Sequence, residues 1–173
     1  MNHTSLIDRL ERFAAVLPAA VAVAPEADLR LKSPEGAWSI LEILGHLADE
    51  EVSDFRARLA FVLEQRQPPW PGIDPEGWAR ERKYNEQDPS EVMARWLRER
   101  RASIVWLRGL PAETDWLLAY EHPKFGPIRA GDLLASWAAH DALHLRQIAK
   151  RLWEGAGRDG EGFRTGYAGE GGM

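Results

Sequence analysis

The sequence predicts an all-α protein, built as a bundle of four long helices around a single hydrophobic core. Four segments place apolar residues at spacings of three and four, which is the period of an amphipathic helix. The chain has 173 residues, a length that suits one domain, and no clear set of strands interrupts the helical pattern. Amphipathic helices without a sheet bury their apolar faces against one another, so a bundle is expected.

The first two helices are marked by apolar stripes and by local start and stop signals. The stripe of the first helix, residues 5–23, consists of Leu6, Leu10, Phe13, Leu17 and Val21. The second helix is predicted over residues 39–67. Ser39 and Glu42 form the S-x-x-E pattern of a capping box at its start. The Pro-Pro pair at 68–69 ends it, because the residue before a proline disfavours helical geometry.

A long connection separates the second helix from the third. Residues 68–88 are rich in proline, glycine and charge, and a connection of this length in a small domain is often functional. The third helix opens with Asp88 as N-cap, Pro89 at the first helical position and Glu91 completing a capping box. It is expected to end near Arg108, where glycine and proline follow.

The last part of the chain holds a turn, the fourth helix and a tail. Residues 112–129 read as an extended segment with a turn, consistent with a small hairpin. The fourth helix is predicted from about residue 131 to about 153. Beyond it the chain is rich in glycine and poor in apolar residues. The predicted organisation is therefore a helical domain over 1–154 and a flexible tail over 155–173.

The composition excludes several classes of protein. The net charge is −5, without the concentrated basic face of a nucleic-acid binder, so no nucleic-acid partner is expected. The Arg-rich stretch 95–101 alternates with apolar residues and indicates a solvated helix face. The chain has no cysteine, which rules out disulfides, thiolate metal ligands and a cysteine nucleophile.

The first residues and the hydropathy pattern predict a cytoplasmic protein. Residues 1–12 lack the basic start and apolar run of a signal peptide. No apolar stretch approaches the roughly 20 residues that span a bilayer. We therefore expect no membrane partner.

Two histidines lie four residues apart in the predicted fourth helix. His140 and His144 share one helix face, about 6 Å apart along the axis, so both rings can point at one ion. A pair at this spacing also arises by chance. His46 stands among apolar residues of the second helix, where a core histidine held by a hydrogen bond is the alternative interpretation.

Taken together, the three histidines predict one metal site. Three neutral imidazoles suit Zn²⁺, Ni²⁺, Fe²⁺ or Mn²⁺, and the ligand type does not separate these ions. Three protein ligands leave coordination positions for water or substrate, which is the pattern of a catalytic site. We expect one divalent ion bound by His46, His140 and His144.

Two stretches resemble the DinB/YfiT-like superfamily. Residues 38–50 place a tryptophan before a helix that carries His-Leu-Ala-x-x-acid. Residues 126–148 contain Gly-Pro, then Leu-Leu, and then His-Asp-x-x-His-x-x-Gln-Ile. Their order, about ninety residues apart, is what makes the resemblance specific. The sequence departs from the family at Ala130, where members often carry a threonine that caps the fourth helix.

The resemblance implies an up-down-down-up four-helix bundle with a metal near one end. The family's ligand positions correspond to His46, His140 and His144. Many members are homodimers, so a homodimer is expected. Relatives include thiol-dependent transferases and isomerases that use mycothiol, bacillithiol or glutathione, while others are described as metal-dependent hydrolases.

Three residues near the histidines are candidates for supporting roles. Glu50 lies one turn after His46 and is a candidate general base for metal-bound water, with a salt bridge as the alternative. Gln147 lies three residues after His144 and is a candidate to bind a ligand or substrate, or to make an interhelical hydrogen bond. Trp137 is a candidate wall of the pocket, with core packing as the alternative.

Further polar residues are assigned weaker roles. Asp49 is a second candidate for the role of Glu50. Asp141 points away from His140 and is expected to pair with Arg146 or another basic residue. Arg151 follows His144 by seven residues, where its charge would favour an anionic thiol cofactor, unless it extends to solvent.

These observations support two functions. The first is a metal-dependent enzyme, either a thiol (S-)transferase or a hydrolase, acting on a small-molecule substrate. Without cysteine in the chain, any thiolate must come from a low-molecular-weight thiol. The second is a non-catalytic metal- or ligand-binding module of a stress response. A bundle whose histidines hold no metal is the remaining alternative.

Overall fold

The computed structural model of the protein describes residues 2–33 and 35–169. The helices of its bundle are α1 (His3–Val21), α2 (Ile40–Glu50), α3 (Ala57–Leu63), α5 (Pro89–Arg108) and α6 (Ala130–Asp159). A π-helix (Glu51–Arg56) joins α2 to α3, and the short helix α4 (Pro75–Glu81) precedes α5. Short 3-10 turns cover Glu26–Asp28, Tyr84–Glu86 and Gly166–Ala168, and the two strands are β1 (Ala119–His122) and β2 (Gly126–Arg129).

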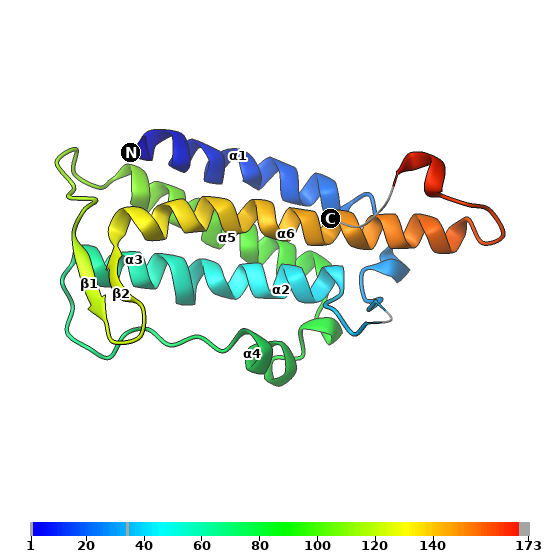
Figure 1. Ribbon diagram of the computed structural model, residues 1–173, viewed down its shortest axis with the longest axis horizontal. Coiled ribbons are helices and arrows are strands. Elements are labelled where there is room, and N and C mark those ends of the chain that lie inside the picture. The colour runs from blue at the N-terminus through cyan, green and yellow to red at the C-terminus, as the bar shows by residue number, and fades with distance from the viewer. Residues whose placement is uncertain (1, 34, 170–173) are drawn as a thin grey trace.

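The bundle has the up-down-down-up order. Figure 1 shows α1 and α6 running in one direction, while the α2–α3 rod and α5 run in the opposite direction. Two consecutive helices that run parallel need a connection that returns along the bundle. Residues 64–88, with α4, form this connection on the outside of the bundle (Figure 1). The predicted fold class and the long connection are therefore confirmed.

The core holds the apolar stripes that the sequence predicts. Leu10, Phe13 and Leu17 of α1 are buried, and Leu10 and Leu17 have no exposed surface. One group of buried residues gathers around α2 and Trp96, and a second around α3 and Trp137. Burial of such side chains contributes about 25 cal/mol per Å² of apolar surface, so the stripes hold the helices in register.

The second predicted helix differs from the structure in its interior. Residues 39–67 were expected as one α-helix, whereas a π-helix replaces the α-helix over Glu51–Arg56, and α3 ends at Leu63. A π-turn adds a residue to the helical repeat, so it turns the following side chains relative to an ideal α-helix. Residues 51–56 contain no glycine or proline that would mark the change, and the sequence pattern therefore does not reveal it.

Two features define the start and the end of α6. The helix begins at Ala130 without a threonine cap, because the Asp132 carboxylate accepts the backbone N–H of Arg129 at 3.1 Å. It ends at Asp159, six residues beyond the predicted end, and so continues across residue 154. Arg158 pairs with Asp28 there, which ties the extension to the bundle. The flexibility of the segment beyond this helix stays a prediction.

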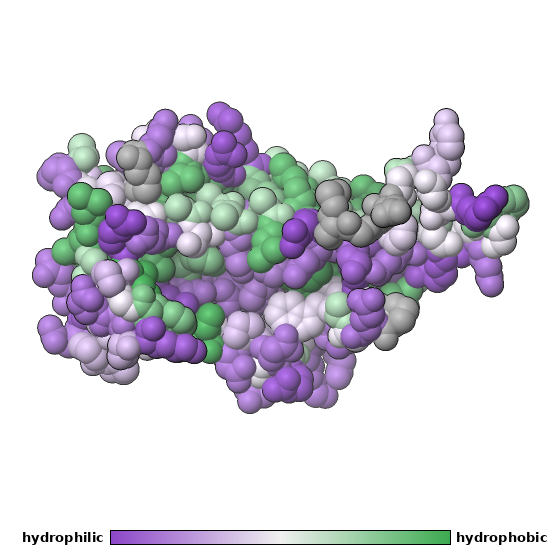
Figure 2. All heavy atoms as spheres, in the orientation of Figure 1, coloured by the Kyte–Doolittle hydropathy of each residue, from purple (hydrophilic) through white to green (hydrophobic). Residues whose placement is uncertain are grey.

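The predicted hairpin between α5 and α6 is confirmed. Strands β1 and β2 pair antiparallel, with Tyr120 opposite Ile128. Gly126 has a φ of +71°, a left-handed conformation that glycine adopts without strain. On the face drawn in Figure 2, hydrophilic side chains predominate around α4, and apolar ones lie between α1 and α6. Within residues 2–33 and 35–169, no helix has both the length and the apolar character of a membrane span.

Candidate metal centre

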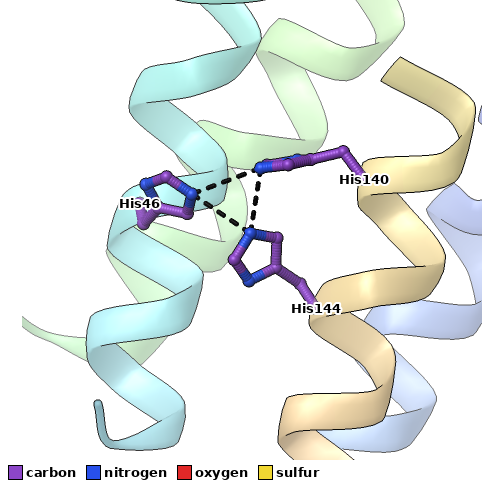
Figure 3. Close-up of side chains that lie close together, drawn as sticks. All are labelled: His46, His140 and His144. Carbon is purple, nitrogen blue, oxygen red and sulfur yellow. Dashed lines mark hydrogen bonds between the residues drawn. The ribbon is translucent and has the colours of Figure 1, made fainter. Parts of the chain in front are cut away.

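Three histidine side chains from two helices converge between α2 and α6. His46 comes from α2, and His140 and His144 come from successive turns of α6 (Figure 3). Their Nε2 atoms are 3.4 Å apart for His46 and His140, 3.1 Å for His46 and His144, and 2.9 Å for His140 and His144. The expectation that these three residues meet in space is confirmed.

The spacing of these nitrogens suits ligands of a single ion. Two nitrogens that each bind an ion at about 2.0–2.1 Å, with an angle of 90–110° between them, are about 2.9–3.4 Å apart. The three Nε2 distances lie within this range. His46, His140 and His144 also form a group of potential ligand atoms that lie within 4.8 Å of one another.

The three imidazoles are neutral at physiological pH. Burial lowers the pKa of His46 to about 3, and the nearby His144 adds to this effect. Burial lowers the pKa of His140 to about 2, with further contributions from His144, His46 and Arg100. Burial also lowers the pKa of His144, against a hydrogen bond that the ring donates to Gln147 and that raises it. Neutral imidazole is the form that binds a metal ion.

Gln147 sets the tautomer of His144. Nδ1 of His144 donates a hydrogen bond of 2.7 Å to Oε1 of Gln147. With its proton on Nδ1, the ring presents the lone pair of Nε2 to His46 and His140. Hydrogen bonds of this kind orient histidine ligands in metal sites. Gln147 thus hydrogen-bonds a candidate metal ligand within α6 rather than between helices, and its contact with a substrate stays a prediction.

Glu50 lies behind the ring of His46. Its Oε1 atom is 3.7 Å from Nδ1 of His46, and both side chains are buried. The Nε2 atom that faces the other histidines is on the opposite side of the ring (Figure 3). Burial, together with Asp54, raises the pKa of Glu50 to about 9. This position suits support of His46 better than the predicted contact with metal-bound water.

Aromatic rings surround the histidines. Trp38 packs against His46 with 4.8 Å between ring centroids, and Phe55 packs edge-on against His140 at 4.9 Å. Trp137 is stacked on Phe55 at 5.6 Å between ring centroids and is buried, with its Nε1–H donated to Glu51. The structure thus gives Trp137 the core-packing role, and Trp38 contacts the site instead.

A cavity of about 570 Å³ opens beside the histidines. Its wall includes His46 and His144, and its other lining residues are Gly36, Ala37, Trp38, Ile43, Glu76, Arg146, Gln147, Lys150 and Arg151. This volume is typical of a site for a small molecule. His46 and His144 are therefore reachable by a ligand, as a site with open coordination positions requires.

The chain is similar to a known family and to known proteins. The model of the DinB superfamily matches residues 9–148. The chain belongs to the DinB superfamily. Two proteins of Oceanobacillus iheyensis, each named "Putative metal-dependent hydrolase", are 28% and 29% identical over 123 and 116 residues. The first match covers 71% of this chain and 69% of the relative, and the second covers 65% and 64%.

A solved structure supports the same fold. It is described as "YfiT from Bacillus subtilis is a probable metal-dependent hydrolase with an unusual four-helix bundle topology". The TM-score is 0.77 at 22% identity, and the match covers 89% of this chain and 87% of that one. The unusual order of helices in this DinB-superfamily chain is thus shared with a solved relative.

Other polar residues of this DinB-superfamily chain lie away from the three Nε2 atoms. Asp49 is held by Arg82, Arg95 and the hydroxyl of Tyr84, so it is not available to the metal centre. Asp141 pairs with a basic residue, as expected, but this residue is Arg100 of α5 and not Arg146.

The sequence did not predict that three further residues line the cavity. Trp38 is part of the family motif, and its place directly before the capped helix of His46 is the sequence signal that could have predicted its contact with the site. Arg146 and Lys150 are two and six residues after His144, which places them on a different face of an ideal helix. They reach the cavity wall through the length of their side chains, which helical spacing does not predict.

Replacing Gln147 with leucine is expected to lower the affinity for a divalent metal by about 10- to 100-fold. The substitution removes the acceptor of the Nδ1 proton, so the ring of His144 loses its preferred tautomer and orientation. Isothermal titration with Zn²⁺ measures the change. Gln67→Leu, an exposed glutamine outside the cavity, is the matched control. Equal affinities in the two variants would show that Gln147 does not orient His144.

Proposed function

We propose that this chain is a metal-dependent hydrolase that acts on a small-molecule substrate. One divalent ion, held by His46, His140 and His144, is the proposed cofactor. The observation that carries the proposal is the triangle of three neutral Nε2 atoms, 2.9–3.4 Å apart, beside a cavity of about 570 Å³ whose wall includes His46 and His144. The names of the two relatives from Oceanobacillus iheyensis agree with this activity.

The donor set suits a catalytic ion better than a structural one. Structural zinc sites use four protein ligands, whereas three ligands leave room for water and substrate. When bound, a divalent ion supplies Lewis-acid chemistry that makes water reactive near neutral pH. Imidazole ligands accept Zn²⁺, Ni²⁺, Fe²⁺ and Mn²⁺, so all four are candidates.

The residues around the ligands have separate tasks in this proposal. Gln147 keeps the proton of His144 on Nδ1, away from His46 and His140. Glu50 lies beside Nδ1 of His46 and supports that ring from behind. Trp38 and Ile43 form an apolar part of the wall, which excludes water from one side of a bound substrate.

The test is metal content together with hydrolysis. Untagged protein is loaded in turn with each of the four ions, analysed for bound metal, and assayed against a panel of esters, amides and phosphoesters. We expect about one equivalent of metal and hydrolysis of at least one class. Both should be lost in His140→Ala and retained in His122→Ala, a histidine in the hairpin that is outside the cavity wall.

Three outcomes would contradict the proposal in different ways. Less than about a tenth of an equivalent of any ion would exclude the metal centre. Turnover that requires an added low-molecular-weight thiol would replace hydrolysis with thiol transfer. Selective binding of metal and ligand without turnover of any substrate class would favour the non-catalytic module.

A further inference from the structure

The wall of the cavity beside the histidines carries an excess of positive charge. Arg146, Lys150 and Arg151, all from α6, line it, and Glu76 of α4 is the one acidic side chain among its described lining residues. The basic residues are concentrated on the α6 side, next to His144 and Gln147. This contrasts with the net charge of −5 of the whole chain.

Arg151 is the most buried of these cations and has donors to spare. Its side chain is only 8% exposed, and its Nη2 atom donates to Glu154 at 2.9 Å. Its Nε and Nη1 atoms are buried and have no hydrogen-bond partner in the part of the chain that the structure describes. Buried donors of a charged group that lack an acceptor are costly, and an anionic acceptor would remove this cost.

The other two cations are also incompletely paired. Lys150 has Glu35 as its partner at 3.9 Å, a long contact with a carboxylate that is largely exposed. Arg146 is exposed and makes no ion pair with any residue of the ranges 2–33 and 35–169. Both side chains are therefore free to turn towards an anion in the cavity, next to Arg151.

The helix geometry sets the distance between this positive region and the metal centre. Arg151 follows His144 by seven residues, which is two turns on the same face of α6 and about 10 Å along the axis. Gln147 lies between them. A molecule that reaches both ends must therefore be elongated, with its anionic group about two helical turns from the metal ligands.

We propose that the cavity selects an elongated substrate that carries a carboxylate or a phosphate at the end remote from the metal. Arg151 is the central anchor for this anion, and Arg146 and Lys150 are auxiliary partners. The inference rests on the proposed function for the metal end, since it names the substrate class of that same site. The position of the anionic group is inferred from the charges and unpaired donors of α6 alone.

The test uses metal-binding probes of matched length. The protein is loaded with Zn²⁺ and titrated with hydroxamates whose linkers bracket about 10 Å and end in a methyl, a carboxylate or a phosphonate group. We expect at least one anionic probe to bind about 10-fold more tightly than the methyl probe of equal length. The preferred terminus distinguishes a carboxylate from a phosphate substrate.

Variants locate the anion. In Arg151→Met the anionic probe should lose most of its gain in affinity over the methyl probe. The affinity for the methyl probe should stay within about 2-fold of that of the unmodified protein, because no metal ligand is changed. Arg66→Met removes an exposed arginine outside the cavity and should keep the full preference. Equal affinity for anionic and methyl probes in the unmodified protein would overturn the inference, as would a full preference in Arg151→Met.

Two further measurements keep the test decisive. If Arg151→Met does not fold, the exposed residues are replaced together in Arg146→Met/Lys150→Met, which should lower the preference at least about 3-fold. If the protein takes up no metal, its binding of inorganic phosphate alone is measured by ³¹P line broadening. The same measurement is made on Arg66→Met and on Arg146→Met/Lys150→Met. Failure to bind metal thus counts against the proposed function, and failure to discriminate anions counts against this inference.

Discussion

Replacing Arg100 with methionine is expected to lower the free energy of unfolding by about 3–5 kcal/mol. Arg100 is 1% exposed and donates to both carboxylate oxygens of Asp141, at 2.7 and 2.8 Å, and to Glu51 at 2.9 Å. It also donates to the backbone oxygen of Leu10 at 3.0 Å. Its removal leaves two buried carboxylates without their cation, which costs far more than a surface ion pair.

Urea unfolding of the metal-free protein measures this effect without a contribution from ligand binding. The matched control is Arg66→Met, which breaks an ion pair with Glu64 that is about half exposed on each side. This control should cost about 1 kcal/mol or less. The triple variant Arg100→Met/Glu51→Gln/Asp141→Asn should recover part of the loss, because it removes the unpaired charges. A loss below about 1 kcal/mol in Arg100→Met would show that the buried network is not needed for stability.

Saturation with a tightly bound divalent metal is expected to raise the Tm by about 5–10 °C. A ligand at 100 times its Kd stabilises the folded state by about 2.7 kcal/mol. For a domain of this size, 1 kcal/mol corresponds to about 2–4 °C. The three histidines come from α2 and α6, so an ion between them links two helices that are far apart in the chain.

Thermal unfolding with and without metal, and after addition of a chelator, measures this shift. The chelator should return the Tm to its metal-free value. In His140→Ala the rise should fall below about 2 °C, since the remaining pair of ligands binds more weakly. His122→Ala should retain the full rise. A rise of equal size in His140→Ala would place the stabilising ion at a different site.

Short-range signals in the sequence predicted the helices well. The capping box of Ser39 and Glu42 is present, with hydrogen bonds of 2.9 and 3.0 Å. Asp88 caps α5 through the backbone N–H groups of Ser90 and Glu91. These contacts join residues two or three positions apart, so the local sequence contains both partners. The convergence of the histidines also followed, because His140 and His144 share a helix face and the family motif added His46.

Other features depend on residues that are far apart in the chain. The network of Arg100 joins positions separated by 41 to 90 residues, and Asp141 could be matched with its partner only in the folded bundle. Trp38, rather than Trp137, lies against the site, because Trp137 packs on Phe55, which itself contacts His140, while Trp38 packs on His46. The end of α6 likewise depends on the contact of Arg158 with Asp28.

For this protein, local sequence and motif order were sufficient to identify the helices, the bundle and the three histidines. Caps and apolar stripes act over one or two turns, and two ligands lie on one helix. The tertiary structure alone decided the distances between the Nε2 atoms, the place of Glu50 behind His46, and the basic wall around Arg151. These depend on the packing of α2 against α6 and on long side chains, whose positions are set by the fold rather than by their spacing.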